Sequence, residues 1–201
     1  MARVLVLHAR LPDGPAPPVL AALLMRLPYA KRLELERRDA AGQAAALAGV
    51  WLALEAAARL RGCAVPAGSL RFPGSGRPHL AGGPSFSISH GVTRVAAAVS
   101  EDAGIGLDLE EVAMDGGDAV TMLAERRRLE RWTATEATLK AAGRGLRDLR
   151  LVALDESRAM ATLAGEVYRL AAVTMAERVV ACLASSARIE AVEVAETILP
   201  A

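Results

Sequence analysis

The spacing of apolar residues divides the chain into strand-like and helical stretches. Residues 3–8 form a short apolar run typical of a strand, and a loop rich in proline and glycine follows at 12–18. From 19 to 60, Ala, Leu, Glu and Arg recur at helical spacing, with Pro28 as an interruption and Gly62 placed as a C-cap. The pattern predicts two or three helices after a first strand.

Short apolar runs between Gly and Pro turns predict strands in the rest of the chain. One group comprises residues 69–72, 85–89, 94–100 and 105–112, and a second comprises 149–154, 166–175, 178–185 and 190–196. Between them, helical spacing predicts helices at 118–130 and 133–142. The fold class is therefore α+β.

Two similar runs, 94–100 and 178–184, each form the second arm of a predicted hairpin. They suggest two similar α+β halves related by a pseudo-two-fold axis, residues 1–104 and 105–201, each a small antiparallel sheet with packed helices. Together the halves would make one globular unit, with the site in the cleft between them, near residues 100–110. Chance similarity in an alanine-rich chain is the alternative.

Composition narrows the class of partner. The 201 residues are 53% hydrophobic and 23% charged with a net charge of +1, and aromatics make up 3%, which argues against a nucleic-acid or anionic-membrane partner. Cys63 and Cys182 belong to no metal or disulfide pattern, so a reducing cytoplasm is expected. No apolar run approaches the ~18 residues of a membrane span, and no signal peptide is expected.

Two acidic residues follow each other at strand spacing. Asp108 and Glu110 are two positions apart, so a strand would place both carboxylates on one face. That arrangement is a candidate site for a hard cation. The alternative is an ordinary half-exposed strand end.

A second pair of charged residues stands at helical spacing. Glu136 and Lys140 are four positions apart, so a helix would bring both to the same ligand. Two structural explanations compete with a site. Thr133 and Glu136 fit a capping box, and an exposed Glu–Lys pair is a common surface feature that contributes only ~0.3–0.5 kcal/mol.

Donors suited to a phosphate lie upstream of the acidic strand. Arg77, Ser89 and His90 combine a guanidinium, a hydroxyl and an imidazole with nearby glycines. A histidine after a strand is more often structural than a ligand. No Gly-x-Ser-x-Gly motif is present, so a serine hydrolase is not supported.

The order of these segments carries more weight than any one of them. Gly76-Arg77-Pro78, Phe86-Ser-Ile-Ser-His90, Gly106-Leu-Asp-Leu-Glu110 and Trp132-Thr-Ala-Thr-Glu136-Ala-Thr-Leu-Lys140 follow one another along the chain. This series resembles the motifs of the 4′-phosphopantetheinyl transferases of the surfactin-synthetase-activating type. The firm resemblance spans residues 69–146, and softer similarity covers 37–40 and 44–54.

The resemblance implies an enzyme that transfers the 4′-phosphopantetheine arm of coenzyme A, its substrate, to a serine of an apo acyl or peptidyl carrier protein. It implies a monomer that depends on Mg²⁺, with Mn²⁺ as the alternative. The implied metal ligands are Asp108, Glu110 and Glu136. Glu136 and Lys140 are the implied catalytic residues, as base and as neutraliser of the pyrophosphate. The residues implied to bind coenzyme A are Arg38, Arg77, Ser89, His90, Asp108 and Lys140.

The chain departs from the family pattern at several positions. Thr135 replaces the usual lysine, Gly91 replaces a serine, and Arg77 replaces a lysine. Residues 111–131 form a shorter segment than usual, where Met114, Val120, Met122 and Leu123 are candidates for an apolar docking patch or for plain core packing. The alternative functions are a catalytically impaired relative that binds coenzyme A or a carrier protein, and an unrelated α+β binding domain.

Overall fold

The computed structural model describes residues 1–73, 78–102, 104–113 and 118–201. Four helices are described: α1 (Pro18–Leu24), α2 (Tyr29–Glu36), α3 (Ala40–Arg61) and α4 (Ala119–Ala141). The strands are β1 (Ala2–Arg10), β2 (Leu70–Arg71), β3 (His79–Leu80), β4 (Ser85–His90), β5 (Arg94–Ser100), β6 (Ile105–Glu111), β7 (Ala153–Leu154), β8 (Met160–Leu163), β9 (Glu166–Ala172), β10 (Val179–Ser185) and β11 (Ile189–Glu196). Short 3₁₀ turns cover Ala67–Ser69 and Leu146–Leu151. The α+β class is confirmed.

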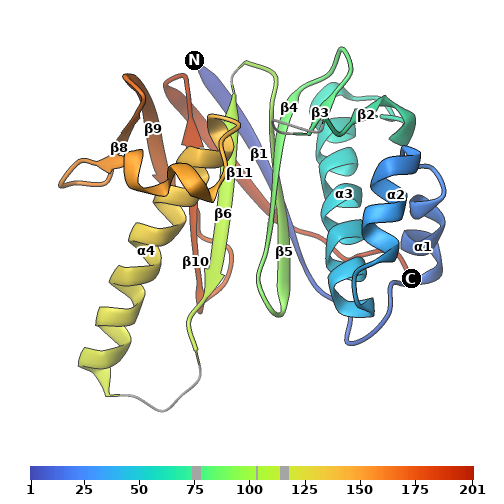
Figure 1. Ribbon diagram of the computed structural model, residues 1–201, viewed down its shortest axis with the longest axis horizontal. Helices are drawn as coiled ribbons and strands as arrows, with labels where there is room; N and C mark the ends of the chain where they lie inside the picture. The colour runs from blue at the N-terminus through green and yellow to red at the C-terminus, as the bar shows by residue number, and fades with distance from the viewer. Residues whose placement is uncertain (74–77, 103, 114–117) are drawn as a thin grey trace.

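Two sheets form the centre of the molecule, with helices on either side (Figure 1). The first has the strand order β11-β1-β5-β4 and the second β6-β10-β9-β8-β7, while β2 and β3 form a separate ribbon. The long helix α3 packs on β5 and β4, and α4 packs on β6 and β10. Strands β4 and β6, one edge of each sheet, lie next to each other.

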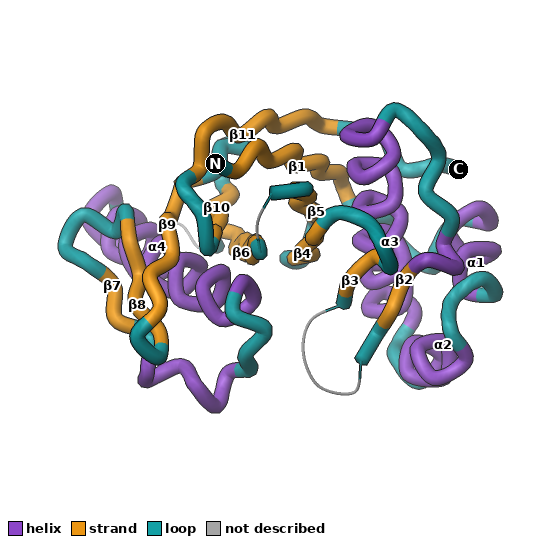
Figure 2. The backbone as a smooth tube through the Cα atoms, turned by 90° about the horizontal axis from the view of Figure 1, so that it is seen from above, coloured by secondary structure: helices purple, strands orange, loops and turns teal. Residues whose placement is uncertain are grey.

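The last strand, β11, belongs to the first sheet, although it lies after residue 104, where the two halves of the chain are predicted to divide. Strand β11 pairs in parallel with β1, in a register that includes Val4 with Val192 and Val6 with Val194. Figure 2 shows the two strands running side by side. The second part of the chain therefore contributes a strand to the first sheet, which the alternation of apolar residues does not reveal.

Helix α3 is capped at both ends. The Asp39 carboxylate accepts from the Gly42 amide at 2.8 Å, and Gly62 adopts the left-handed conformation at the C-cap. By length and composition α3 is apolar enough to cross a membrane, but 56% of that stretch is buried inside the protein. Leu47 and Leu52 are fully buried in the core that α3 shares with the first sheet.

Helix α4 is one continuous helix, so the prediction of two helices is wrong. Asp118 caps it, accepting from the Thr121 amide at 2.8 Å. Thr133 lies inside the helix, where its hydroxyl donates to the Glu130 carbonyl at 3.3 Å. The predicted capping box is therefore also wrong. No proline or glycine interrupts residues 119–141, so an established helix propagates through Thr133, Thr135 and Thr138.

Two serines connect the adjacent edges of the sheets. The Ser87 hydroxyl accepts from the Leu107 amide at 2.9 Å, and the Ser89 hydroxyl accepts from the Leu109 amide at 3.2 Å. Both serines are buried. We call this contact between β4 and β6 the serine seam. The serine hydroxyls here accept from β6 amides that would otherwise lack a hydrogen-bond partner at a buried sheet edge.

Gly106 sets how closely α4 approaches β6. A Cβ at this position would collide with the Ala137 carbonyl oxygen and the Ala141 amide nitrogen. We expect Gly106→Ala to lower the free energy of unfolding by about 3 kcal/mol, because helix backbone cannot yield as a side chain can. Differential scanning calorimetry should show a Tm lower by about 6–12 °C. Gly145→Ala, with nothing within 4 Å of the added Cβ, is the control and should shift Tm little.

His8 predicts a pH dependence of stability. It is buried on β1, and its Nδ1 lies 3.3 Å from Arg94 Nη1, which can only donate, so the ring must be neutral. Burial lowers the pKa of His8, the Glu196 carboxylate opposes this shift, and the Arg94 charge adds to it.

The folded state therefore binds fewer protons than the unfolded state just below pH 6.5, the ordinary value for histidine. We expect the free energy of unfolding to fall as the pH drops from 6.5 through the folded pKa. Urea unfolding of the wild type and His8→Gln at several pH values should show a flatter dependence in the variant. His79→Gln, at an exposed position, should keep the wild-type slope. An equal slope in His8→Gln would contradict the assignment.

Candidate active site

Asp108 is the most buried charged group at the junction of the sheets, with 3% of its surface exposed. Its Oδ1 atom accepts from Lys140 Nζ at 2.6 Å and from the Ser89 hydroxyl at 2.9 Å. Oδ2 is also buried and has no hydrogen-bond partner within the described part of the chain. A buried carboxylate oxygen without a partner is costly, which indicates a position suited to a ligand.

Ser89 joins the three elements that build the site. From β4, its hydroxyl donates to Asp108 on β6 and accepts from Lys140 Nζ on α4 at 3.2 Å. It also accepts the Leu109 amide in the serine seam. The hydroxyl thus makes one donated and two accepted hydrogen bonds, which is its full capacity.

Glu136 lies one helical turn before Lys140 on α4. Its Oε2 atom is 4.0 Å from Lys140 Nζ, so the ammonium lies between this carboxylate and Asp108. Burial raises the pKa of Glu136, and the negative charge of Asp108 raises it further, against the opposing effect of Lys140. The predicted i,i+4 pair is present, and it faces the acidic strand instead of being a plain surface pair.

Glu110 is held by a residue whose role the sequence did not reveal. The Trp132 indole N–H donates to Glu110 Oε1 at 3.1 Å. Burial raises the pKa of Glu110, the charge of Asp108 raises it too, and the indole hydrogen bond lowers it. In the sequence, Trp132 stands out only as part of the 132–140 motif. A helix residue and a strand residue 22 positions apart carry no sequence signal of contact.

Asp108, Glu110 and Glu136 offer three carboxylates for a metal ion. The negative charge of Asp108 raises the pKa of both Glu110 and Glu136, and Asp108 Oδ2 has no hydrogen-bond partner in the described residues. Oxygen donors of this kind suit Mg²⁺. As they stand, no three acidic, histidine or cysteine side chains among the described residues are grouped closely enough to hold an ion. The oxygen donors and the negative charge are of the kind that suits a divalent cation, but in this arrangement the three carboxylates do not surround one ion position, and Lys140 neutralises Asp108.

Cys182 borders Asp108 without adding charge. It lies opposite Asp108 in the ladder between β10 and β6. Burial raises the pKa of its thiol to about 12, so the thiol is neutral at physiological pH. A neutral buried thiol is a poor ligand for a hard cation.

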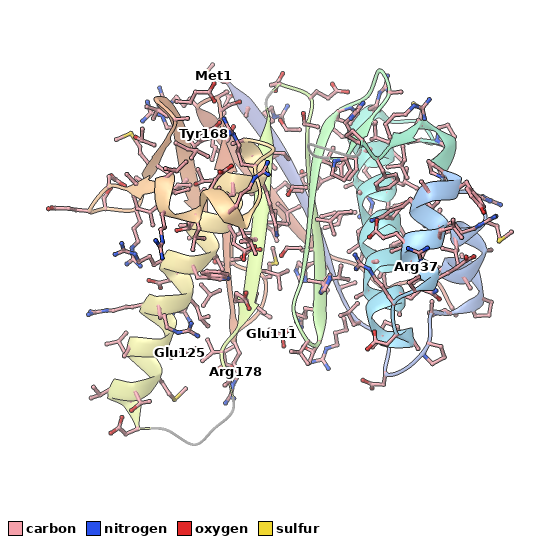
Figure 3. All side chains as sticks on the ribbon, in the orientation of Figure 1. Met1, Arg37, Glu111, Glu125, Tyr168 and Arg178 are labelled. Atoms are coloured by element: carbon pink, nitrogen blue, oxygen red, sulfur yellow. The ribbon has the colours of Figure 1, made fainter. Side chains whose placement is uncertain are left out.

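The predicted phosphate-binding residues are placed less closely together. His90 is exposed at the end of β4, next to Ser89. Arg38 follows α2 and pairs with Glu34 at 2.9 Å. Figure 3 shows its neighbour Arg37 on the side of the molecule that carries α1, α2 and α3, away from α4. Arg77 lies outside the described residues. The structure brings Ser89 to the acidic cluster and gives no contact between Arg38 and that cluster among the described residues.

The Glu111 side chain lies close to Gly91, the glycine that follows His90. Its carboxylate accepts from the Thr93 and Arg94 amides at 2.8 and 3.1 Å, which ties the β4–β5 hairpin to β6 (Figure 3). A Cβ on Gly91 would lie 2.5 Å from Glu111 Oε1. A serine at position 91 would therefore require the Glu111 carboxylate to move.

The first turns of α4 are exposed. Val120, Met122 and Leu123 have 76%, 43% and 51% of their surface exposed, so the prediction of core packing is wrong for them. In Figure 1 this half of α4 extends past the end of β6. Met114 lies outside the described residues. The remaining prediction for these side chains is an apolar docking patch.

No protein-family model matches the chain, and no curated protein is significantly similar to it. A functional assignment therefore rests on the motifs and on the geometry at the junction of the sheets.

Proposed function

We propose that the protein is a Mg²⁺-dependent 4′-phosphopantetheinyl transferase that uses coenzyme A and an apo acyl or peptidyl carrier protein. The observation that carries the proposal is the contact of Lys140 with Asp108 at 2.6 Å, with the Glu136 carboxylate 4.0 Å from the same ammonium. With the Ser89 hydroxyl 2.9 Å from the same Asp108 carboxylate, three motifs separated along the chain thus meet at one place. In the reaction, the carrier serine oxygen bonds to the phosphorus of the pantetheine arm. The pyrophosphate P–O bond breaks, and adenosine 3′,5′-bisphosphate leaves.

Glu136 is the proposed base. Its pKa is raised by burial and by the charge of Asp108, so it holds a proton more readily than an exposed glutamate does. A base whose pKa approaches the working pH transfers protons efficiently. Glu136 would take the serine proton as the oxygen–phosphorus bond forms.

Lys140 is the proposed partner of the leaving group. Its ammonium is already fixed in place by Asp108 and Ser89, so little rearrangement is needed to face developing negative charge. Phosphoryl transfer depends mainly on such positioned charge. Asp108, Glu110 and Glu136 would hold Mg²⁺, or Mn²⁺, which when bound neutralises pyrophosphate oxygens.

The coenzyme A assignments follow the resemblance. By resemblance, Ser89, His90, Arg77 and Arg38 form the set that binds the 3′-phosphate and adenosine end. The exposure of His90 at the end of β4 supports its part in this set. We further propose that the protein acts as a monomer in the cytoplasm, with neither nucleic acid nor membrane as a partner.

We also infer that the two halves are related by a pseudo-two-fold axis. In each half a long helix begins at an aspartate cap, Asp39 or Asp118, that accepts from the amide three residues on. Each helix packs on the strand that contains one of the two similar runs, β5 or β10. The likeness of capping and packing supports duplication more strongly than the runs alone.

The test is intact-mass spectrometry of apo carrier proteins incubated with coenzyme A and this protein. The expected result is a gain of one phosphopantetheine arm that a chelator abolishes. No gain on acyl or peptidyl carriers, with coenzyme A binding still measurable by calorimetry, would favour the impaired, binding-only alternative. Thr135 is the feature that favours this alternative, since it replaces a cation and its hydroxyl donates to the Arg131 carbonyl of its own helix at 2.8 Å.

A further inference from the structure

Ser87 and Ser89 form a natural pair for comparison. Both are buried on β4, and both hydroxyls accept a backbone amide of β6, at 2.9 and 3.2 Å. They therefore make the same structural contribution to the serine seam. Among the described residues, Ser89 alone of the two also contacts charged groups, Asp108 at 2.9 Å and Lys140 at 3.2 Å.

The Ser89 hydroxyl has no capacity left for a substrate. Its one proton is directed to Asp108, and its two acceptor positions are taken by Lys140 and the Leu109 amide. A phosphate oxygen accepts hydrogen bonds, so it would need the proton that Asp108 now receives. If the Ser89 hydroxyl donated to a phosphate instead, Asp108 would lose a hydrogen bond that stabilises its buried charge.

We propose that Ser89 is a positioning residue, which fixes Asp108 and Lys140 as one unit across the serine seam and does not bind coenzyme A. This assignment rests on the proposed transferase function and departs from the role implied by resemblance. Without the hydroxyl, Lys140 is the one remaining hydrogen-bond donor to the Asp108 carboxylate in the described part of the chain. The ammonium also loses a contact that keeps it from shifting toward Glu136, 4.0 Å away.

Loss of the Ser89 hydroxyl should lower the rate of the chemical step and leave the affinity for coenzyme A unchanged. Small displacements of groups that meet the reacting atoms lower the rate strongly, up to about 10²-fold for 1 Å. Loss of a group that contacts the ground state and transition state equally would instead raise KM. The two roles of Ser89 therefore predict different kinetic changes.

The experiment compares wild type, Ser89→Ala, Ser89→Thr and the matched control Ser87→Ala. Transfer is measured as kcat and KM for coenzyme A, coenzyme A affinity by calorimetry without carrier protein, and stability by thermal unfolding. We expect Ser89→Ala to lower kcat about 10- to 100-fold, with KM and Kd for coenzyme A within about twofold of wild type. Ser87→Ala should lose comparable stability and keep kcat within about twofold. Ser89→Thr, which retains a hydroxyl, should recover much of the rate.

Each other outcome overturns the assignment. A tenfold weaker Kd for coenzyme A in Ser89→Ala with unchanged kcat would make Ser89 a substrate ligand. Equal losses of kcat in Ser89→Ala and Ser87→Ala would make its role purely structural. If Ser89→Ala does not fold, the comparison uses Ser89→Thr and Ser87→Ala. A low kcat in folded Ser89→Thr, while Ser87→Ala stays active, counts against positioning by the hydroxyl. A wild type that transfers no arm refutes the proposed function itself, and the role of Ser89 fails with it.

Discussion

Asp108→Asn is expected to lower the rate of phosphopantetheine transfer by about 10³-fold, since a single preorganised charged contact can contribute 10²–10³ or more. The substitution preserves shape and removes the charge that pairs with Lys140 at 2.6 Å. It also removes the negative oxygen, Oδ2, that has no partner in the described residues and would serve as a metal ligand. The measurement is single-turnover transfer to an apo carrier protein, followed by mass spectrometry.

Glu111→Gln provides the control for Asp108→Asn. Glu111 is a carboxylate on the same strand, but it serves the β4–β5 hairpin by accepting from Thr93 and Arg94. Its amide variant should keep transfer within about threefold of wild type while losing a little stability. Circular dichroism of Asp108→Asn should match the wild type. A folded Asp108→Asn with undiminished transfer would remove this residue from the reaction.

Glu136→Gln should have opposite effects on activity and stability. Loss of the proposed base should lower kcat by about 10²- to 10⁴-fold. The Tm at neutral pH should rise, because burial and the Asp108 charge make the ionised Glu136 unfavourable in the folded state. The measurements are transfer kinetics and calorimetric unfolding of the same preparations.

The stability difference should depend on pH with a defined sign. The pKa of Glu136 is raised in the folded state, so the folded protein binds its proton more readily than the unfolded chain does. The stability of wild type relative to Glu136→Gln is therefore greatest at low pH and is lost as the pH rises through the folded pKa. The advantage of the variant should shrink on acidification.

Glu130→Gln is the control on the same helix. Glu130 pairs with Arg158 at 2.9 Å and with Arg126 at 3.5 Å, away from the acidic strand. This variant should keep its activity and should not gain stability. A lower Tm in Glu136→Gln at neutral pH would show that its pairing with Lys140 outweighs the effects of burial and of Asp108.

Local patterns predicted much of this site. The two-residue spacing of Asp108 and Glu110 and the four-residue spacing of Glu136 and Lys140 each hold in the structure, because strand and helix periods fix which side chains share a face. The predicted junction near residues 100–110 includes most of β6, which lies next to β4 in the structure.

Long-range contacts were beyond the reach of these patterns. The Trp132–Glu110 hydrogen bond and the contacts of Ser89 depend on how α4 and β4 dock on β6, which a local period does not encode. The continuity of α4 was missed because threonines and a capping-box pattern resemble a helix start. In the structure, propagation from Asp118 outweighs that local signal.

The pairing of β1 with β11 also constrains the order of folding. On a ribosome, β1 emerges long before its parallel neighbour β11, whose Ile189 lies opposite Ala2. The first sheet therefore cannot complete its strand order until β11 has also been made, and a contact of such high sequence separation forms slowly. During synthesis one flank of β1 stays open to other chains, so the nascent protein depends on the late arrival of β11 to avoid edge-to-edge association.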